Sequence, residues 1–137
     1  MSYIIALDYG EKRIGVAGAD LELNIASPLD YLENNSDFIK KISKLIENKN
    51  VVTIILGYPL NLKGKKTKKT ADVDAFYILL CRHFSQEIIK VDERLTSIQA
   101  QKNLYRLGHT SKSSRNKIDS QAAAILLETY LKQLSKK

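Results

Sequence analysis

Three acidic residues, Asp8, Glu93 and Asp119, each stand beside apolar residues that predict a buried strand or helix face. Burying an unpaired carboxylate is costly, so such a residue is expected at a wet edge, in a hydrogen bond or on a cation. Three carboxylates at one edge would repel one another when ionised, and a divalent cation would resolve that repulsion. Carboxylate oxygens favour Mg2+ or Mn2+ over zinc. Two such ions about 4 Å apart can hold a phosphodiester, activate water and stabilise the leaving oxygen.

Asp8 directly follows residues 3–7, which form a run that is apolar on both faces. Such a run predicts a central strand in a sheet covered on both sides, with Asp8 where the strand emerges from the core. A turn through Gly10 then leads into a second extended run at residues 14–17. Taken alone, Asp8 could equally well cap this turn. Its role therefore depends on whether other acids reach the same point.

Glu93 closes an extended run at residues 87–93 and has the same alternation as Ile89 and Val91. It therefore points to an otherwise apolar face of the predicted strand. If this strand runs parallel to the first one, both end at the same edge of the sheet. Asp8 and Glu93 could then face each other there.

Asp119 lies at the start of a predicted helix, on the face that also carries Ala122, Ala123 and Leu126. This face is expected to pack on the sheet, since the spacings are three, four and seven residues. The alternative is a structural role in the first helical turn, where an acid interacts favourably with the helix macrodipole.

The elements that must position these acids predict an α/β fold with a mixed five-stranded sheet, three antiparallel strands followed by two parallel ones. Pro28 suggests that the third strand lies at an edge or contains a bulge. We expect residues 1–137 to form a single domain. The expected strands are 3–7, 14–17, 24–32, 51–56 and 87–93, and the expected helices are 38–46, 71–84, 96–107 and 118–134.

The composition favours a polyanionic partner such as nucleic acid or the ribosome, because the formal net charge is +7 and the pI is about 9.4. No apolar run approaches the roughly 20 residues of a membrane helix, and no signal peptide is predicted. We therefore expect a cytoplasmic protein. The single cysteine, Cys81, excludes an internal disulfide framework and a cysteine-based zinc site, and its apolar helical run predicts a core position.

A lysine-rich loop follows the strand at residues 51–56 and begins at Gly57. No acid offsets its positive charge before Asp72. The run could be a solvated surface, but α/β proteins place their sites beside strand exits, which favours phosphate contact. The lysines of this run are Lys63, Lys65, Lys66, Lys68 and Lys69.

Four ordered motifs resemble those of the RuvX (YqgF) family, small bacterial members of the RNase H-like superfamily, over nearly the whole chain. They are Asp8-Tyr-Gly-Glu-Lys-Arg-Ile-Gly-Val-Ala17, Gly57-Tyr-Pro-Leu60 with Gly64, Asp92-Glu-Arg-Leu-Thr-Ser97, and Asp119-Ser-Gln-Ala-Ala-Ala-Ile-Leu126. The resemblance implies an RNase H-like fold and a metal-dependent nuclease. Its catalytic and metal-binding triad would be Asp8, Glu93 and Asp119, with Mg2+ or Mn2+ as cofactor. Family members are described as Holliday junction resolvases and as cytoplasmic nucleases that mature the 5′ end of pre-16S rRNA, and we adopt the second role.

The chain departs from the family pattern at Tyr58, where leucine is usual, and in the lysine-rich loop that follows. This leaves the triad intact but bears on substrate preference. Arg94, Thr96 and Ser97 could orient Glu93 or bind phosphate, and capping of the next helix is an equal alternative. The residues expected to contact nucleic acid are Lys12, Arg13, Lys63, Lys65, Lys66, Arg94, Thr96, Ser97, Lys112 and Arg115.

Four functions are consistent with these residues. The first is a nuclease acting on structured RNA, namely pre-16S rRNA within ribosomal subunit precursors. The second is a nuclease that cuts branched DNA at four-way junctions, which would require a symmetric dimer, whereas the first allows a monomer or a weak homodimer. The third is a nonenzymatic ribosome-assembly factor. The fourth, an actin-like ATPase suggested by Asp8-Tyr-Gly10, is disfavoured because such enzymes clamp nucleotide between two domains.

Overall fold

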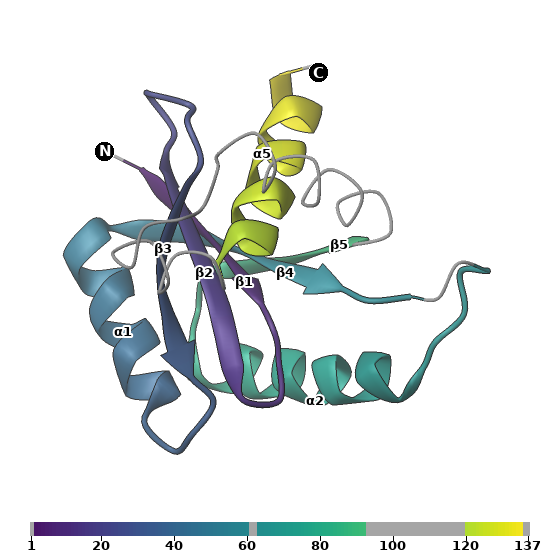
Figure 1. The fold of residues 1–137 in the computed structure, drawn as a ribbon. Coiled ribbons are helices and arrows are strands. Elements are labelled where there is room, and N and C mark those ends of the chain that lie inside the picture. The colour runs from purple at the N-terminus through teal and green to yellow at the C-terminus, as the bar shows by residue number, and fades with distance from the viewer. Residues whose placement is uncertain (1, 61–62, 93–119, 136–137) are drawn as a thin grey trace, which may run out of the picture.

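The central strand of the fold is β1 (Tyr3–Asp8), in a five-stranded sheet of order β3-β2-β1-β4-β5 (Figure 1). The computed structural model describes residues 2–60, 63–92 and 120–135. β1 pairs antiparallel with β2 and parallel with β4; β2–β3 is antiparallel and β4–β5 parallel. The other strands are β2 (Arg13–Asp20), β3 (Ser27–Glu33), β4 (Val51–Tyr58) and β5 (Glu87–Asp92). The predicted mixed α/β sheet is confirmed, with Pro28 in an edge strand.

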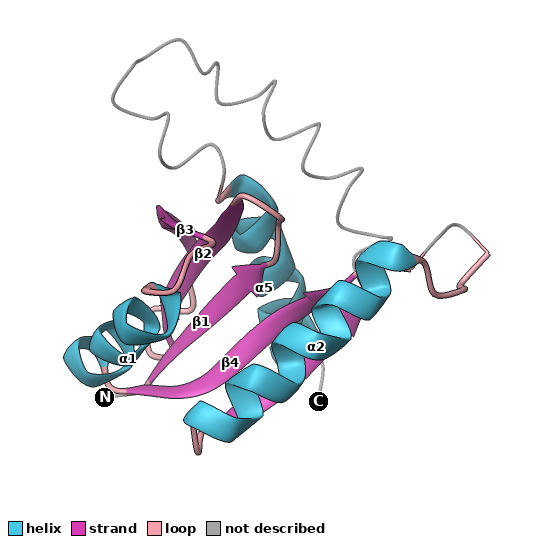
Figure 2. Ribbon diagram, turned by 90° about the horizontal axis from the view of Figure 1, so that it is seen from below, coloured by secondary structure: helices cyan, strands magenta, loops and turns pink. Residues whose placement is uncertain are grey.

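Helices cover both faces of the sheet. In Figure 2, α1 (Phe38–Lys49) and α2 (Lys68–His83) lie on the near face, and α5 (Gln121–Ser135) lies behind the sheet. β1 is apolar on both faces because it serves both layers. Ile5 and Leu7 pack in the cluster under α1 and α2, whereas Ile4 and Ala6 pack in the cluster under α5. Alternation along the strand therefore assigns each residue of β1 to a layer.

The layer under α5 is built largely from small side chains. Ala6, Ala17 and Ala19 on the strands meet Ala123 and Leu127 on the helix, and all five are buried. Small residues at a helix–sheet contact let the helix backbone approach the sheet closely. The chain thus brings its last described helix against its first two strands.

Most element boundaries differ by a few residues from the sequence expectations, and two of these differences bear on the site. α2 begins at Lys68, three residues before the expected start, because Thr67 caps it by accepting a hydrogen bond from the Thr70 amide. Thr70 in turn bonds back to the Thr67 amide and donates to the carbonyl of Pro59. β4 continues through Gly57 to Tyr58, because both residues pair with β5. Lys68 and Lys69 therefore belong to a helix and not to a loop.

The core position expected for Cys81 is wrong, because its side chain is exposed. Neighbouring Leu80 is fully buried, together with Phe76 and Val73, so the buried stripe of α2 passes beside Cys81 and not through it. An apolar run in a helix can hold one residue that faces away from the core, and its direction depends on the phase of the helix.

Within residues 2–60, 63–92 and 120–135, no helix combines the length and apolarity that crossing a membrane requires. The helix expected at residues 96–107, with Gly108 and the polar loop after it, lies outside the described residues.

Candidate active site at the carboxyl ends of the parallel strands

The three parallel strands β1, β4 and β5 end at one edge of the sheet. The pairing aligns Leu7 with Leu56, and the next residue of β4, Gly57, aligns with Val91 of β5. Asp8 therefore lies two strands away from the end of β5, and neighbouring strands are about 4.8 Å apart. In open α/β sheets the carboxyl ends of the strands are where ligands bind. β1 and β5 therefore run parallel to each other, as the predicted acid site requires.

Asp8 lies on the α5 side of the sheet. It alternates with Ile4 and Ala6, which pack under α5. Ile89 and Val91 of β5 pack against the same cluster. Asp8 and Val91 thus share one face as well as one edge of the sheet.

The Asp8 side chain is half-buried, and within the described chain it makes no hydrogen bond or ion pair. The turn-capping alternative for Asp8 therefore has no support there. A half-buried carboxylate without a protein partner suits an oxygen ligand for a hard cation. Among the described residues no group of three or more His, Cys, Asp or Glu side chains could hold a metal. The other two acids of the predicted triad, Glu93 and Asp119, lie outside this part of the chain.

The turn after Asp8 is fixed by Gly10 and Asn34. A Cβ atom on Gly10 would lie 2.5 Å from the carbonyl oxygen of Arg13, so the turn is too tight for any other residue. The Asn34 side chain donates to the Gly10 carbonyl at 2.8 Å, and its backbone amide donates to the Lys12 carbonyl at 2.9 Å. The end of β1 is therefore held from the segment that follows β3.

Ser120 ties the start of the last helix to this edge, a role the sequence analysis missed. Its buried hydroxyl accepts a hydrogen bond of 2.9 Å from the Val16 amide. The register between β2 and β3 shifts between Ile14 and Val16, and Ser120 supplies a partner for the amide at that irregularity. Val16 pairs with Leu7, the residue before Asp8. A serine directly after a predicted catalytic acid was the only sequence signal.

Tyr58 organises a charged network beside the end of β4. The Tyr58 hydroxyl raises the pKa of Lys66 and acts to lower the pKa of Asp74. Asp74 lies 3.5 Å from the Lys66 ammonium and 3.8 Å from that of Lys90, which is 5.0 Å from the Tyr58 ring centroid. Desolvation acts to raise the pKa of Asp74, but the Tyr58 hydroxyl and the two lysines together lower it below its ordinary value. The residue that departs from the family pattern thus anchors the end of the lysine-rich loop.

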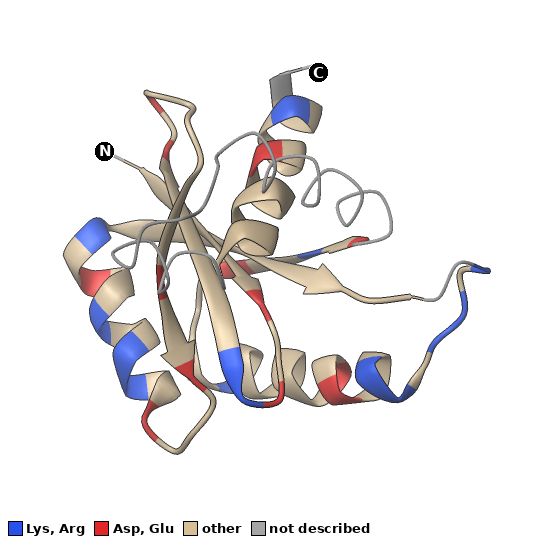
Figure 3. Cartoon of the chain, in the orientation of Figure 1, with Lys and Arg blue, Asp and Glu red and all other residues tan. Residues whose placement is uncertain are grey.

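The remaining predicted basic residues that the structure describes are placed around this edge (Figure 3). Lys12 and Arg13 are exposed at the β1–β2 turn, and the Arg13 guanidinium lies 5.2 Å from the Tyr31 ring centroid. Lys63 and Lys65 are exposed in the segment that leads into α2. The other predicted nucleic-acid contacts lie outside the described residues: Arg94, Thr96, Ser97, Lys112 and Arg115.

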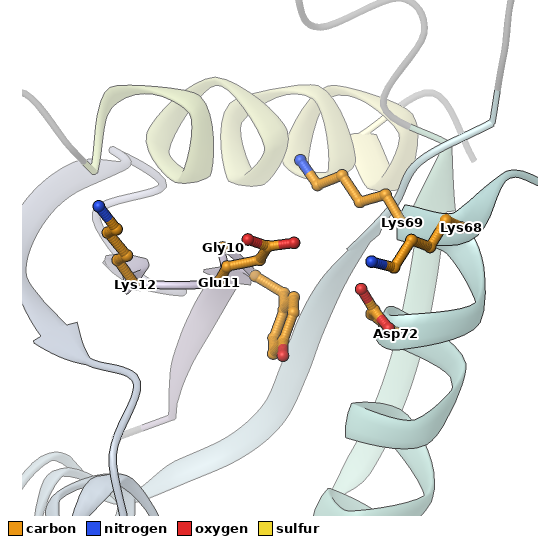
Figure 4. A pocket seen from close by; sticks show the side chains of 7 residues that line it. Gly10, Glu11, Lys12, Lys68, Lys69 and Asp72 are labelled. Carbon is orange, nitrogen blue, oxygen red and sulfur yellow. The ribbon is translucent and has the colours of Figure 1, made fainter.

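A hollow of about 600 Å³ opens at the same edge, between the β1–β2 turn and the first turns of α2 (Figure 4). Figure 4 shows Glu11 extending from the turn toward α2, with Lys68 and Lys69 extending from α2 toward the turn, while Lys12 points away. The lining residues are Tyr9, Gly10, Glu11, Lys12, Lys68, Lys69 and Asp72. Lys68 and Lys69 belong to the lysine run for which phosphate contact was predicted, but they were not among the individual residues expected to contact nucleic acid.

Comparison with known sequences gives one consistent result. Residues 2–133 match the family model described as "RuvX: Holliday junction resolvase". A protein of Sulfurihydrogenibium sp. (strain YO3AOP1) named "Putative pre-16S rRNA nuclease" is 42% identical, over 98% of this chain and 93% of its own length. A protein of the same name from Orientia tsutsugamushi (strain Ikeda) is 38% identical, over 96% of this chain and 84% of its own length.

Two of the solved structures that share the fold are Holliday junction resolvases. T. thermophilus RuvC, in complex with a Holliday junction substrate, gives a TM-score of 0.58 at 8% identity, covering 98% of this chain and 96% of that one. The Fowlpox virus resolvase, in complex with Holliday junction DNA, gives a TM-score of 0.54 at 14% identity, covering 96% and 98%. At these identities the likeness shows a shared RuvC-like, RNase H-like fold.

Proposed function

This chain belongs to the RuvX (YqgF) family, and from that premise we propose that it is a divalent-metal-dependent nuclease that processes the 5′ end of pre-16S rRNA in the cytoplasm. The observation that carries the proposal is the Asp8 carboxylate at the shared end of three parallel strands, which has no hydrogen bond or ion pair within the described residues. A carboxylate kept there without a protein partner is what a metal-assisted phosphodiesterase requires.

The described neighbours of the other two acids support a triad of Asp8, Glu93 and Asp119. Asp92 ends β5 at the Asp8 edge, and Ser120 is hydrogen-bonded to Val16 beside that edge. Each predicted acid is one residue along the chain from such an anchor, and consecutive Cα atoms are about 3.8 Å apart. We therefore propose that all three carboxylates reach one site on the α5 side of the sheet.

These carboxylates would hold Mg2+ or Mn2+, since all of their donors are hard oxygens. A bound ion of this kind lowers the pKa of water and stabilises the leaving oxygen, so no side chain need act as a general base. The chain's own contribution is to hold its acids on rigid strand and helix ends. Its basic residues at this edge, Lys12, Arg13, Lys63 and Lys65, would position the flanking phosphates. A phosphate that contacts Lys66 would have to compete with Asp74.

Asp8→Asn is expected to lower the rate of metal-dependent cleavage by more than about 100-fold. Substitution of a residue that only orients a metal ligand typically costs about 10–100-fold, and a ligand itself should cost more. The amide removes the charge and keeps the shape, so the fold and the thermal midpoint should change little. The measurement is cleavage of a 16S precursor fragment and of a four-way junction, each with Mg2+, Mn2+ or chelator.

The matched control is Asp30→Asn, which removes one exposed carboxylate from the edge strand β3 and should retain full activity. Full activity of Asp8→Asn would remove Asp8 from the site. Cutting of the junction but not of the precursor would favour the resolvase function given in the family description. If Asp8→Asn kept ribosome maturation in cells, the protein would be a nonenzymatic assembly factor.

A further inference from the structure

The hollow between the β1–β2 turn and α2 carries charges of both signs. Lys68, Lys69 and Asp72 lie on the first turns of α2, and Glu11 faces them from the turn (Figure 4). Within the described residues, none of these four side chains forms an ion pair within 4.0 Å or a side-chain hydrogen bond. Four charged groups therefore line one hollow without neutralising one another directly.

The two lysines are badly placed for the stability of the helix. Lys68 and Lys69 are the first two residues of α2, which has no acid in its first turn. The amino end of a helix carries partial positive charge and favours anions, so cations there oppose the macrodipole. The same charges favour a bound phosphate, because the unpaired amides and both ammonium groups attract it. The lysines are thus better explained by an anionic ligand than by the fold.

The two acids argue against a site for phosphate alone. Glu11 and Asp72 would repel a bound phosphate, and neither forms an ion pair with another described residue. A carboxylate instead accepts a hydrogen bond from a hydroxyl group. In a nucleic acid the group that lies close to a phosphate and donates such a bond is the ribose 2′-hydroxyl, which distinguishes RNA from DNA. Asp72 is half-buried and is four residues after Lys68, so a phosphate at Lys68 would place a ribose near it.

We propose that this hollow binds one ribonucleotide of the substrate strand, with Lys68 and Lys69 on its phosphate and Asp72 accepting a hydrogen bond from its 2′-hydroxyl. The inference rests on the proposed nuclease function and sharpens it, because it makes the substrate RNA. The hollow includes Tyr9, the residue after Asp8, which packs on the α2 side of the sheet, whereas Asp8 lies on the α5 side. A strand bound in the hollow would therefore cross the edge of the sheet to reach the acid site. Recognition of ribose and cleavage then belong to adjacent parts of the same edge.

The test is equilibrium binding of fluorescent single strands of one sequence, as RNA and as DNA, to the full chain carrying Asp8→Asn in chelator. We expect RNA to bind about tenfold more tightly, as one hydrogen bond to a charged group provides. Asp72→Ala should bring the ratio of the two dissociation constants close to one. Asp72→Asn should keep most of the preference, because the amide oxygen still accepts a hydrogen bond.

Lys68→Gln/Lys69→Gln should weaken binding of RNA and DNA equally and lower the slope of log affinity against log salt by about 0.7, the value for one phosphate contact on a single strand. The control is Lys40→Gln/Lys44→Gln, which removes two exposed charges from α1, outside the hollow. If the control variant weakens binding by the same amount, Lys68 and Lys69 act only through the net charge of the protein. Their proposed contact with the phosphate would then be overturned.

Equal binding of RNA and DNA to the parent would overturn the ribose contact, as would an unchanged ratio in Asp72→Ala. Loss of the preference in Glu11→Gln but not in Asp72→Ala would also overturn the assignment to Asp72. Failure of the nuclease proposal is separate. Wild-type protein that shows the RNA preference but cleaves no substrate with Mg2+ or Mn2+ would refute the nuclease and leave the hollow intact.

Discussion

At the scale of single residues, the site depends on polar groups whose partners are far away in the chain. Ser120 is the clearest case, since its hydroxyl satisfies the Val16 amide 104 residues earlier. This bond fixes the residue before α5 to β2, in addition to the apolar contacts that pack the helix on β1 and β2. Asp8 is the opposite case, because its carboxylate is left without a partner in the described chain. Both residues fit an edge whose geometry is fixed before any metal or substrate binds.

Ser120→Ala should lower the free energy of unfolding by about 1–3 kcal/mol, the cost of leaving a buried amide without a partner. Urea denaturation measures this change, and Ser27→Ala at an exposed position of β3 should stay within about 0.5 kcal/mol of wild type. If Asp119 belongs to the site, cleavage by folded Ser120→Ala should also fall. An unchanged stability would mean that the amide finds another partner.

At the scale of elements, α2 combines a strong cap with an unfavourable first turn. Thr67 and Thr70 form a reciprocal capping box, and Thr70 also ties the helix to the Pro59 carbonyl. This cap stabilises a helix that then begins with Lys68 and Lys69. The network of Tyr58, Asp74 and Lys66 fixes the loop before it. The start of α2 is thus held firmly while two cations remain exposed to a ligand.

Lys68→Gln/Lys69→Gln should stabilise the protein, by about 0.3–1 kcal/mol for each lysine at low ionic strength, because two charges that oppose the macrodipole are removed. Urea denaturation at low and high salt measures this, and the gain should fade as salt screens the charges. A loss of stability would show that the lysines support the fold, and a ligand would then not be needed to explain their positive charge.

At the scale of the whole molecule, the sheet joins two cores. Leu80 of α2 is buried on one face and Leu127 of α5 on the other, and β1 contributes to both clusters. The formal charge of +7 is spread around this body and favours a polyanionic substrate in general. It does not distinguish RNA from DNA, which the side chains of the hollow can do.

We predict that residues 1–137 unfold as one unit. Leu80→Ala and Leu127→Ala should each lower the free energy of unfolding by about 2–5 kcal/mol, because each leaves a cavity in a core that shares the sheet. Both should shift a single urea transition with an unchanged slope. Leu134→Ala, at a side chain that is 41% exposed, should have little effect. Two separate transitions would show two independently folding parts.

The sequence by itself determined the family, the order of strands and helices, and the position of Asp8 at the end of a central strand. These follow from local patterns, since alternation and helical spacing are properties of neighbouring residues. It also predicted the edge position of Pro28 correctly. The prediction that Cys81 is buried was wrong, because the side of α2 that faces the core is set by the elements on which the helix packs.

Only the tertiary structure decided the Ser120–Val16 bond, the Tyr58 network and the hollow beside Asp8. Each joins segments that are far apart in the sequence, and each depends on a strand register or on the residue at which a helix begins. A register shift in β2–β3 exposes one amide, and a cap at Thr67 turns two loop lysines into the wall of a site. Such pairings arise from packing in three dimensions, and no local pattern encodes them.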